Sequence, residues 1–165
     1  MFQEISAKNI EGNVMKMIAD EWMLVAAGDE TKCNMMTASW GFMGEMWGKE
    51  CAMIVIRPTR YTYDFLENSD YFSLSFYGGR RDIHKICGST SGRDVDKIKE
   101  TGLTPVFANH TVYFEEARLV VICKKLYAQD LDPACIVNDD GISKWYNNDY
   151  HRAYWGAIQT VLVKE

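Results

Sequence analysis

Short apolar runs, rather than long amphipathic helices, dominate the pattern of hydrophobic and polar positions along the chain. Met23–Ala27 is wholly apolar and ends at Gly28, as expected of a buried strand. Tyr71–Phe76 alternates aromatic or aliphatic residues with serine, which is typical of a strand with one buried face. The same reasoning predicts four further strands, at residues 34–41, 52–56, 117–128 and 154–163.

Only short helices are expected between these strands. An amphipathic pattern predicts one helix over residues 12–20. Thr59 is a suitable N-cap for another that runs to about Asn68, because its hydroxyl can accept from a backbone amide in the first turn. Two more are expected around residues 81–87 and 94–101, the second capped by Asp94.

The order of these elements predicts a mainly β fold. The strands at 34–41 and 52–56 are expected to be joined by a loop, since glycines stand between them at 41, 44 and 48. Strands and helices do not alternate regularly, which favours an antiparallel barrel with helical excursions over a doubly wound parallel sheet. No repeat, low-complexity tract or linker interrupts the chain, so residues 1–165 are predicted to form one domain.

Composition and charge exclude several classes of function. The net charge of −5, with scattered lysines and arginines, provides no basic surface for nucleic acid. No apolar run approaches the length of a membrane span, and Met1–Glu4 does not begin a signal peptide, so we expect a cytoplasmic protein that does not act at a membrane.

Cysteine and histidine spacing gives no metal site. The five cysteines are odd in number and contain no Cys-x-x-Cys pair, which favours free thiols in a reducing compartment. A redox role for Cys33 is the alternative. His84 and His110 have no partner at ligand spacing, and residues 129–150, although rich in Asp and Asn, do not fit an EF-hand and are interpreted as a long polar loop or lid.

Two segments carry the candidate chemistry. Asn34-Met35-Met36-Thr37-Ala38-Ser39-Trp40-Gly41 places small hydroxyl and amide residues on a strand, where backbone can approach a flat ligand. Arg57-Pro58-Thr59-Arg60-Tyr61-Thr62 places two arginines at a helix start, where an anion is well received. Alternatively, the first is an ordinary strand with a buried tryptophan, and the second is a solvated helix end.

Together with three later segments, these motifs resemble the flavin reductase-like family of FMN-binding split barrels. The first segment matches the family pattern Asn-x-x-Thr-x-Ser-Trp, and residues 88–97 match Gly-x-x-Ser-Gly-Arg-Asp-x-Asp-Lys. Residues 151–158 resemble His-x-x-Tyr-x-Gly-Glu-Ile, with Ala157 in place of the glutamate, and residues 114–124 match more loosely, with Ile122 in place of an acidic residue. The resemblance implies an antiparallel, Greek-key-like split barrel.

The resemblance also implies a set of site residues. The residues expected to bind FMN are Asn34, Thr37, Ala38, Ser39, Trp40, Arg57, Arg60, Tyr61, Thr62, Lys97, His151 and Trp155. Arg57, Arg60, Tyr61 and Thr62 would hold the phosphate, and Lys97 would point toward the phosphate or the pyrimidine edge. His151 is the candidate catalytic residue, because an imidazole can exchange protons near neutral pH.

The implied function is an FMN-dependent oxidoreductase that passes electrons from NAD(P)H through the flavin to an acceptor. The alternative is a flavoredoxin-like electron carrier, which would serve a protein partner and have little NAD(P)H activity. A barrel that binds another planar ligand, or none, is a third possibility. The family further implies a homodimer with the flavin near the subunit interface.

Overall fold

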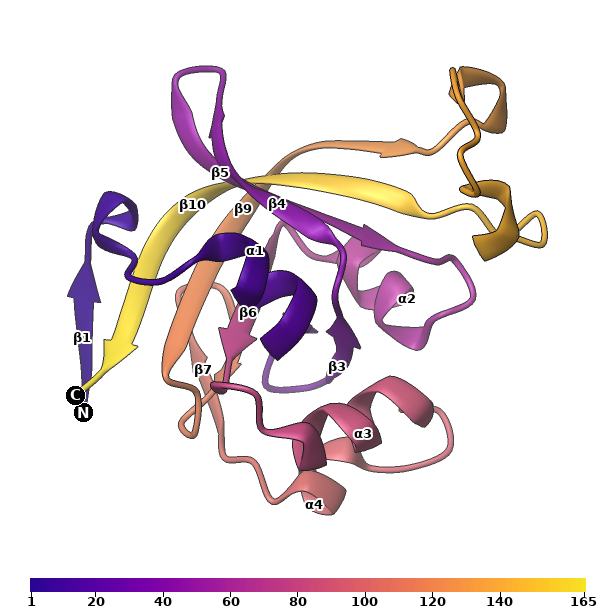
Figure 1. Cartoon of the computed structure of the whole chain (residues 1–165). Coiled ribbons are helices and arrows are strands. Elements are labelled where there is room, and N and C mark those ends of the chain that lie inside the picture. The colour runs from indigo at the N-terminus through magenta and orange to yellow at the C-terminus, as the bar shows by residue number, and fades with distance from the viewer.

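Ten strands and a few short helices make up the regular structure of residues 1–165 in the computed structural model (Figure 1). The strands are β1 (Phe2–Ile5), β2 (Met23–Gly28), β3 (Cys33–Ala38), β4 (Gly41–Met46), β5 (Lys49–Ile56), β6 (Tyr71–Phe76), β7 (Pro105–Ala108), β8 (Thr111–Phe114), β9 (Leu119–Asp130) and β10 (Arg152–Lys164). The longer helices are α2 (Tyr61–Asn68), α3 (Arg81–Ser89) and α4 (Lys97–Thr101).

One antiparallel sheet contains most of the strands, in the order β3-β2-β6-β9-β10-β5-β4, with β1 paired to β10. Its two terminal strands, β3 and β4, are separated in sequence only by Ser39 and Trp40. The sheet must therefore curl until its free edges approach, which gives a barrel that is not closed by hydrogen bonds between β3 and β4. We call the gap bounded by β3, Ser39–Trp40 and β4 the barrel opening. The predicted antiparallel barrel is confirmed.

Strand β2 shows how the core is divided. Met23–Ala27 are all fully buried, because both faces of this strand are covered. Met23, Val25 and Ala27 belong to the core inside the barrel, whereas Leu24 and Ala26 belong to a second apolar cluster with residues of α3 and β8. Successive side chains on a strand point to opposite faces, so a strand buried on both faces needs the continuous apolar run seen in the sequence.

The expected loop with three glycines is instead strand β4 and part of a hairpin. Residues 41–46 pair with residues 49–54 of β5, and the turn is Trp47-Gly48. Both turn residues have positive φ, 56° and 67°, as a tight two-residue hairpin turn requires. The loop prediction was wrong because Gly41 and Gly44 lie in β4, an edge strand, where glycine is tolerated.

The helix boundaries also differ from the sequence-based expectation. Arg60, not Thr59, precedes the first residue of α2, and no side chain caps this helix. At α4, the side chain of Asp96 rather than Asp94 accepts from the Lys99 amide at 3.2 Å. The predicted helix over residues 12–20 is one α-helical turn, α1 (Val14–Lys16), followed by a π-helix over Met17–Glu21.

Residues 131–151 form the expected long loop between β9 and β10. It contains only two short 3-10 turns, η3 (Pro133–Cys135) and η4 (Ser143–Trp145). A third 3-10 turn, η1 (Ala7–Asn9), follows β1. None of the helices has the length and apolar character that a membrane crossing requires. The cytoplasmic location stays a prediction.

Candidate functional site

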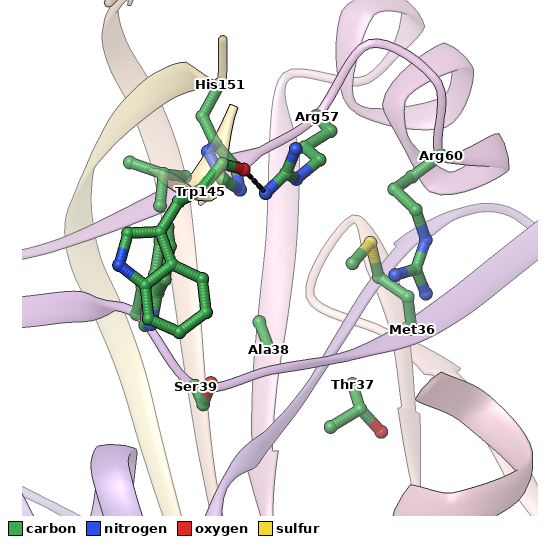
Figure 2. A pocket seen from close by; sticks show the side chains of 10 residues that line it. Met36, Thr37, Ala38, Ser39, Arg57, Arg60, Trp145 and His151 are labelled. Carbon is green, nitrogen blue, oxygen red and sulfur yellow. Dashed lines mark hydrogen bonds between the residues drawn. The ribbon is translucent and has the colours of Figure 1, made fainter. Parts of the chain in front are cut away.

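A cavity of about 320 Å³ lies at the barrel opening. Figure 2 shows its walls, with β3 on one side, Arg57 and Arg60 opposite, and Trp145 across one end. Its lining residues are Met36, Thr37, Ala38, Ser39, Trp40, Val55, Arg57, Arg60, Trp145 and His151. The two segments that carry the candidate chemistry in the sequence therefore meet here, together with His151, which immediately precedes β10.

The free edge of β3 forms the floor of the cavity. Because β3 pairs only with β2, alternate backbone N–H and C=O groups along its other edge have no partner strand. Thr37, Ala38 and Ser39 are half-buried and small, so a ligand can approach this edge closely. The edge offers both donors and acceptors to a ligand with a polar rim.

The two arginines opposite β3 have different partners. The Arg57 guanidinium forms an ion pair with Asp149 and donates to the Trp145 carbonyl oxygen at 2.7 Å (Figure 2). Arg60 has no carboxylate partner, and its guanidinium donates only to the carbonyl oxygens of Cys87 and Gly88, at 3.5 and 3.2 Å. Burial, together with Arg57, lowers the pKa of Arg60 but leaves it a cation. Arg60 is thus the guanidinium that remains open to an anion.

Residues 145–151 close one end of the cavity. The Trp145 ring lies edge-on to Trp40, with ring centroids 5.3 Å apart, and the His151 ring lies 5.1 Å from Trp40. Tyr146 places its hydroxyl 3.0 Å from His151 Nδ1 and its ring under the Arg57 guanidinium. The ion pair between Arg57 and Asp149 therefore fixes a segment of the long loop against the cavity wall.

His151 is neutral in this setting. The histidine is only 8% exposed. Burial, and to a smaller extent the nearby positive charge of Arg57, lowers the pKa of its imidazole to about 4. Asp149 opposes this shift only partly, because its carboxylate is engaged by Arg57 and by the Asn147 amide. A neutral imidazole beside the cavity can donate or accept a hydrogen bond without adding charge.

A second cavity, of about 400 Å³, follows β3 toward its start. It is lined by Asn34, Tyr61 and Lys97 of the predicted set, and by Gly92 and Arg93 of the Ser-Gly-Arg-Asp motif. A Cβ atom on Gly92 would lie 2.1 Å from Asn34 Oδ1, which explains why only glycine fits at that position.

Four of the predicted residues contact other protein groups and do not line the first cavity: Asn34, Tyr61, Thr62 and Lys97. Asn34 is buried and donates to the Thr62 hydroxyl at 2.8 Å, so this pair ties β3 to α2. Lys97 donates to the carbonyl oxygens of Met35 and Cys87, at 2.9 and 3.1 Å, and burial lowers its pKa to about 8. Tyr61 lies under the Arg93 guanidinium, 4.5 Å from ring centroid to Cζ.

The structure places Trp155 and Cys33 away from the first cavity. Trp155 lines two other cavities and contacts the ring of Tyr127. All five cysteines are free, and burial followed by the nearby carboxylates of Asp29 and Asp96 raises the pKa of Cys33. A raised pKa leaves less thiolate, which favours the interpretation of Cys33 as an unreactive thiol.

Three residues that the fold brings to this region could not be identified as site residues from the sequence. Trp145 and Asp149 sit in the polar loop, and Asp149 is separated from Arg57 by 92 positions. His84 has no partner at metal-ligand spacing in the sequence, yet in the fold its ring Nδ1 lies 3.1 Å from the Thr37 hydroxyl oxygen. Within this polar loop, only the aromatic residues Trp145 and Tyr146 indicate a segment that packs against the rest of the protein.

Comparison with known proteins is consistent across sequence and structure. Residues 15–154 match the family model described as the flavin reductase like domain. No curated protein sequence matches the chain at significant similarity. Flavoredoxin from Methanosarcina acetivorans is similar in structure, with a TM-score of 0.69 at 19% identity, over 88% of this chain and 69% of that one.

Two further solved structures share the fold. An FMN-binding protein from Thermus thermophilus, with bound p-hydroxybenzaldehyde, has a TM-score of 0.69 at 21% identity, over 99% of this chain and 82% of that one. The NADH:FAD oxidoreductase of Streptomyces globisporus has a TM-score of 0.65 at 13% identity, over 87% of this chain and 75% of that one. At these identities the likeness concerns the fold.

The depressed pKa of His151 predicts that the folded protein loses stability in mild acid. Between about pH 6.5 and pH 4 the unfolded chain binds a proton at this histidine that the folded chain does not, so the free energy of unfolding falls as the pH falls. Urea denaturation at pH 7 and pH 5 measures this difference. We expect His151→Asn to reduce the difference in unfolding free energy between the two pH values. The asparagine can keep the hydrogen bond to Tyr146.

His110→Asn, the same substitution at an exposed position outside the site, is the matched control. A full wild-type difference in His151→Asn would show that His151 is protonated equally in the folded and unfolded chains.

Proposed function

The chain belongs to the flavin reductase-like domain family, and from this premise we propose that it binds FMN at the barrel opening and acts as an oxidoreductase. The observation that carries the proposal is Arg60, a half-buried guanidinium without a carboxylate partner, facing the free edge of β3 across a cavity. A phosphate supplies the missing anion, and a planar ring with a polar rim supplies partners for the strand edge.

The residues present fit this group. A guanidinium binds phosphate through parallel hydrogen bonds, and Arg60 immediately precedes the first turn of α2, whose free amides also favour an anion. Trp40 and Trp145 provide aromatic walls at the other end of the cavity, where a flat ring would lie. Arg57 would contribute less to phosphate binding, because Asp149 balances its charge and the Trp145 carbonyl oxygen accepts from another of its nitrogens.

The redox chemistry belongs to FMN, which when bound accepts electrons from NAD(P)H and delivers them to an acceptor. The chain itself would bind and orient the cofactor. Backbone groups of Thr37–Ser39 would hold the polar rim of the ring and stabilise added negative charge. His151, neutral and beside Trp40, would present a hydrogen-bonding group to the ring or to an incoming nicotinamide.

One observation favours the alternative of an electron carrier. Trp145 lies against Trp40 and covers one end of the cavity, and the contacts of Arg57 with the Trp145 carbonyl oxygen and with Asp149 hold it there. If this loop stays closed, electrons would be exchanged with a protein partner at the surface rather than with NAD(P)H.

We also propose that two copies of the chain pair through one apolar surface. Exposed apolar residues gather on the β4–β5 hairpin, the outer half of β9 and the long loop, and Trp155 joins the two cavities beneath them. The hairpin and the loop project on the same side of the barrel (Figure 1). The surface consists of Phe42, Met46, Trp47, Leu126, Tyr127, Leu131, Val137 and Ile142. Dimer interfaces are enriched in such side chains.

The first test is FMN binding, measured by fluorescence quenching. Arg60→Ala should weaken FMN binding about 10- to 100-fold, because a hydrogen bond to a charged group contributes about 1.5–3 kcal/mol. Riboflavin, which lacks the phosphate, should bind the variant and the wild type alike. Arg80→Ala, at an exposed arginine paired with Asp82, is the matched control. If Arg60→Ala weakened riboflavin binding as much as FMN binding, Arg60 would not be the residue that binds the phosphate.

Anaerobic reduction separates the reductase from the carrier. The FMN-loaded protein should lose its visible absorption when NADH or NADPH is added, and Trp145→Ala should accelerate this loss by opening the cavity. A carrier would keep its absorption with both nucleotides and lose it only with reduced ferredoxin.

Sedimentation equilibrium tests the proposed pairing. The wild type should be a dimer, and Tyr127→Glu should shift it toward monomer, because a buried unpaired charge opposes association. Met15→Glu, an exposed apolar residue outside this surface, should leave the dimer intact. A wild-type monomer that still binds FMN would refute the interface.

A further inference from the structure

The long loop between β9 and β10 has no core of its own. None of residues 131–150 is buried, and the loop lies beyond the ends of the two strands that it joins (Figure 1). Its own backbone hydrogen bonds mostly close single turns. A segment with so few buried contacts opens locally at little cost in free energy, unless contacts with the rest of the fold hold it in place.

Arg57 is the only residue outside this loop that forms hydrogen bonds with it. Its guanidinium forms the ion pair with Asp149 and donates to the Trp145 carbonyl oxygen at 2.7 Å, the contact drawn in Figure 2. The same guanidinium lies over the Tyr146 ring, 5.2 Å from its centroid. One side chain of the barrel therefore holds residues 145–150, which we call the lid.

The two partners of the ion pair differ in how firmly they are placed. Arg57 directly follows β5 and precedes Pro58, so its backbone is restricted by the proline ring and belongs to the barrel. Asp149 belongs to the lid, where its second carboxylate oxygen accepts from the Asn147 amide at 2.8 Å. Asp149 does not line the cavity. A change at Asp149 therefore acts on the lid and leaves the cavity walls unaltered.

The lid covers the cavity through Trp145. This residue lines the cavity, and its ring lies edge-on to that of Trp40. The side chains of Arg57 and Asp149 are 25% and 28% exposed, so salt and water screen their attraction only in part. Opening the lid would leave a partly buried guanidinium without its carboxylate, which favours the closed position.

We propose that Asp149 is a positioning residue that holds the lid closed, and that the closed lid makes FMN a resident cofactor rather than a flavin substrate released after each turnover. A ligand enters and leaves the cavity while the lid is open, so the ion pair slows both association and dissociation. Because both steps depend on the same opening, Kd changes less than either rate constant when the ion pair is lost. The inference rests on the proposed FMN site.

The kinetics of riboflavin binding test this role, because riboflavin has no phosphate with which a released Arg57 could pair. Stopped-flow fluorescence at several riboflavin concentrations gives the association rate constant from the slope and the dissociation rate constant from the intercept. Asp149→Asn keeps the size of the side chain and removes its charge. It should raise both rate constants about tenfold, as expected for the loss of one hydrogen bond between charged groups.

Two further variants separate the lid from a general effect of the substitution. Asp140→Asn, at an exposed aspartate of the same loop outside the lid, is the matched control and should leave both rate constants at their wild-type values. In Trp145→Ala the lid no longer covers the cavity. Adding Asp149→Asn to that variant should therefore accelerate exchange of riboflavin no further.

Hydrogen exchange in the protein without flavin tests the ion pair independently of the proposed function. The amides of residues 143–150 should exchange faster in Asp149→Asn than in the wild type, whereas those of β2 should be unchanged. Residence is tested separately, since the FMN-loaded wild type should keep its cofactor through gel filtration and Asp149→Asn should lose it.

The outcomes distinguish this inference from the proposed function. A wild type that binds no flavin overturns the proposed function and the residence of FMN, while hydrogen exchange still decides whether Asp149 holds the lid. A wild type that binds flavin, with unchanged rate constants in Asp149→Asn, overturns only the role of Asp149. Faster dissociation with unchanged association would also overturn it, because Asp149 would then support a contact with the bound ligand. Loss of FMN from the wild type on gel filtration would contradict residence.

Discussion

The strand edge left unpaired at the barrel opening is the constraint on which the rest of the site depends. β3 and β4 end the sheet yet are joined through Ser39 and Trp40 alone, so two free edges must meet without a partner strand. Exposed edges are a hazard, because they can recruit other strands. Here the gap is lined by small side chains, guanidinium groups and tryptophans, which form a polar cavity suited to the flat, anionic ligand that we propose.

The two arginines of this cavity differ in their partners and therefore in what they can do. Asp149 neutralises Arg57, and the resulting ion pair fixes Trp145 and Tyr146 of the long loop beside the cavity. Arg60 keeps its positive charge unpaired, and its donors otherwise contact only carbonyl oxygens at the end of α3. The same helix contacts β3 through His84 and Thr37, so α3 helps to position both Arg60 and one wall of the cavity.

The sequence predicted those parts of the fold that local physics determines. The buried run at Met23–Ala27 and the alternation at Tyr71–Phe76 needed no tertiary information, and both are strands. β4 escaped prediction because its glycines resemble a loop. Most of the candidate residues do converge on one cavity, but the pairing of Arg57 with Asp149, and of Thr37 with His84, depends on contacts between distant parts of the chain. Patterns of neighbouring residues do not predict contacts between positions so far apart in the chain.

Hydrogen–deuterium exchange with and without FMN tests the central claim most directly, since it reports where the cofactor protects the backbone. If FMN binds along the free edge of β3, the amides of residues 33–41 and the first turn of α2 should exchange more slowly when it is added. Amides of β7 and β8, on the separate hairpin, should be unaffected. Unchanged exchange in β3, with protection elsewhere, would contradict a cofactor site at the barrel opening.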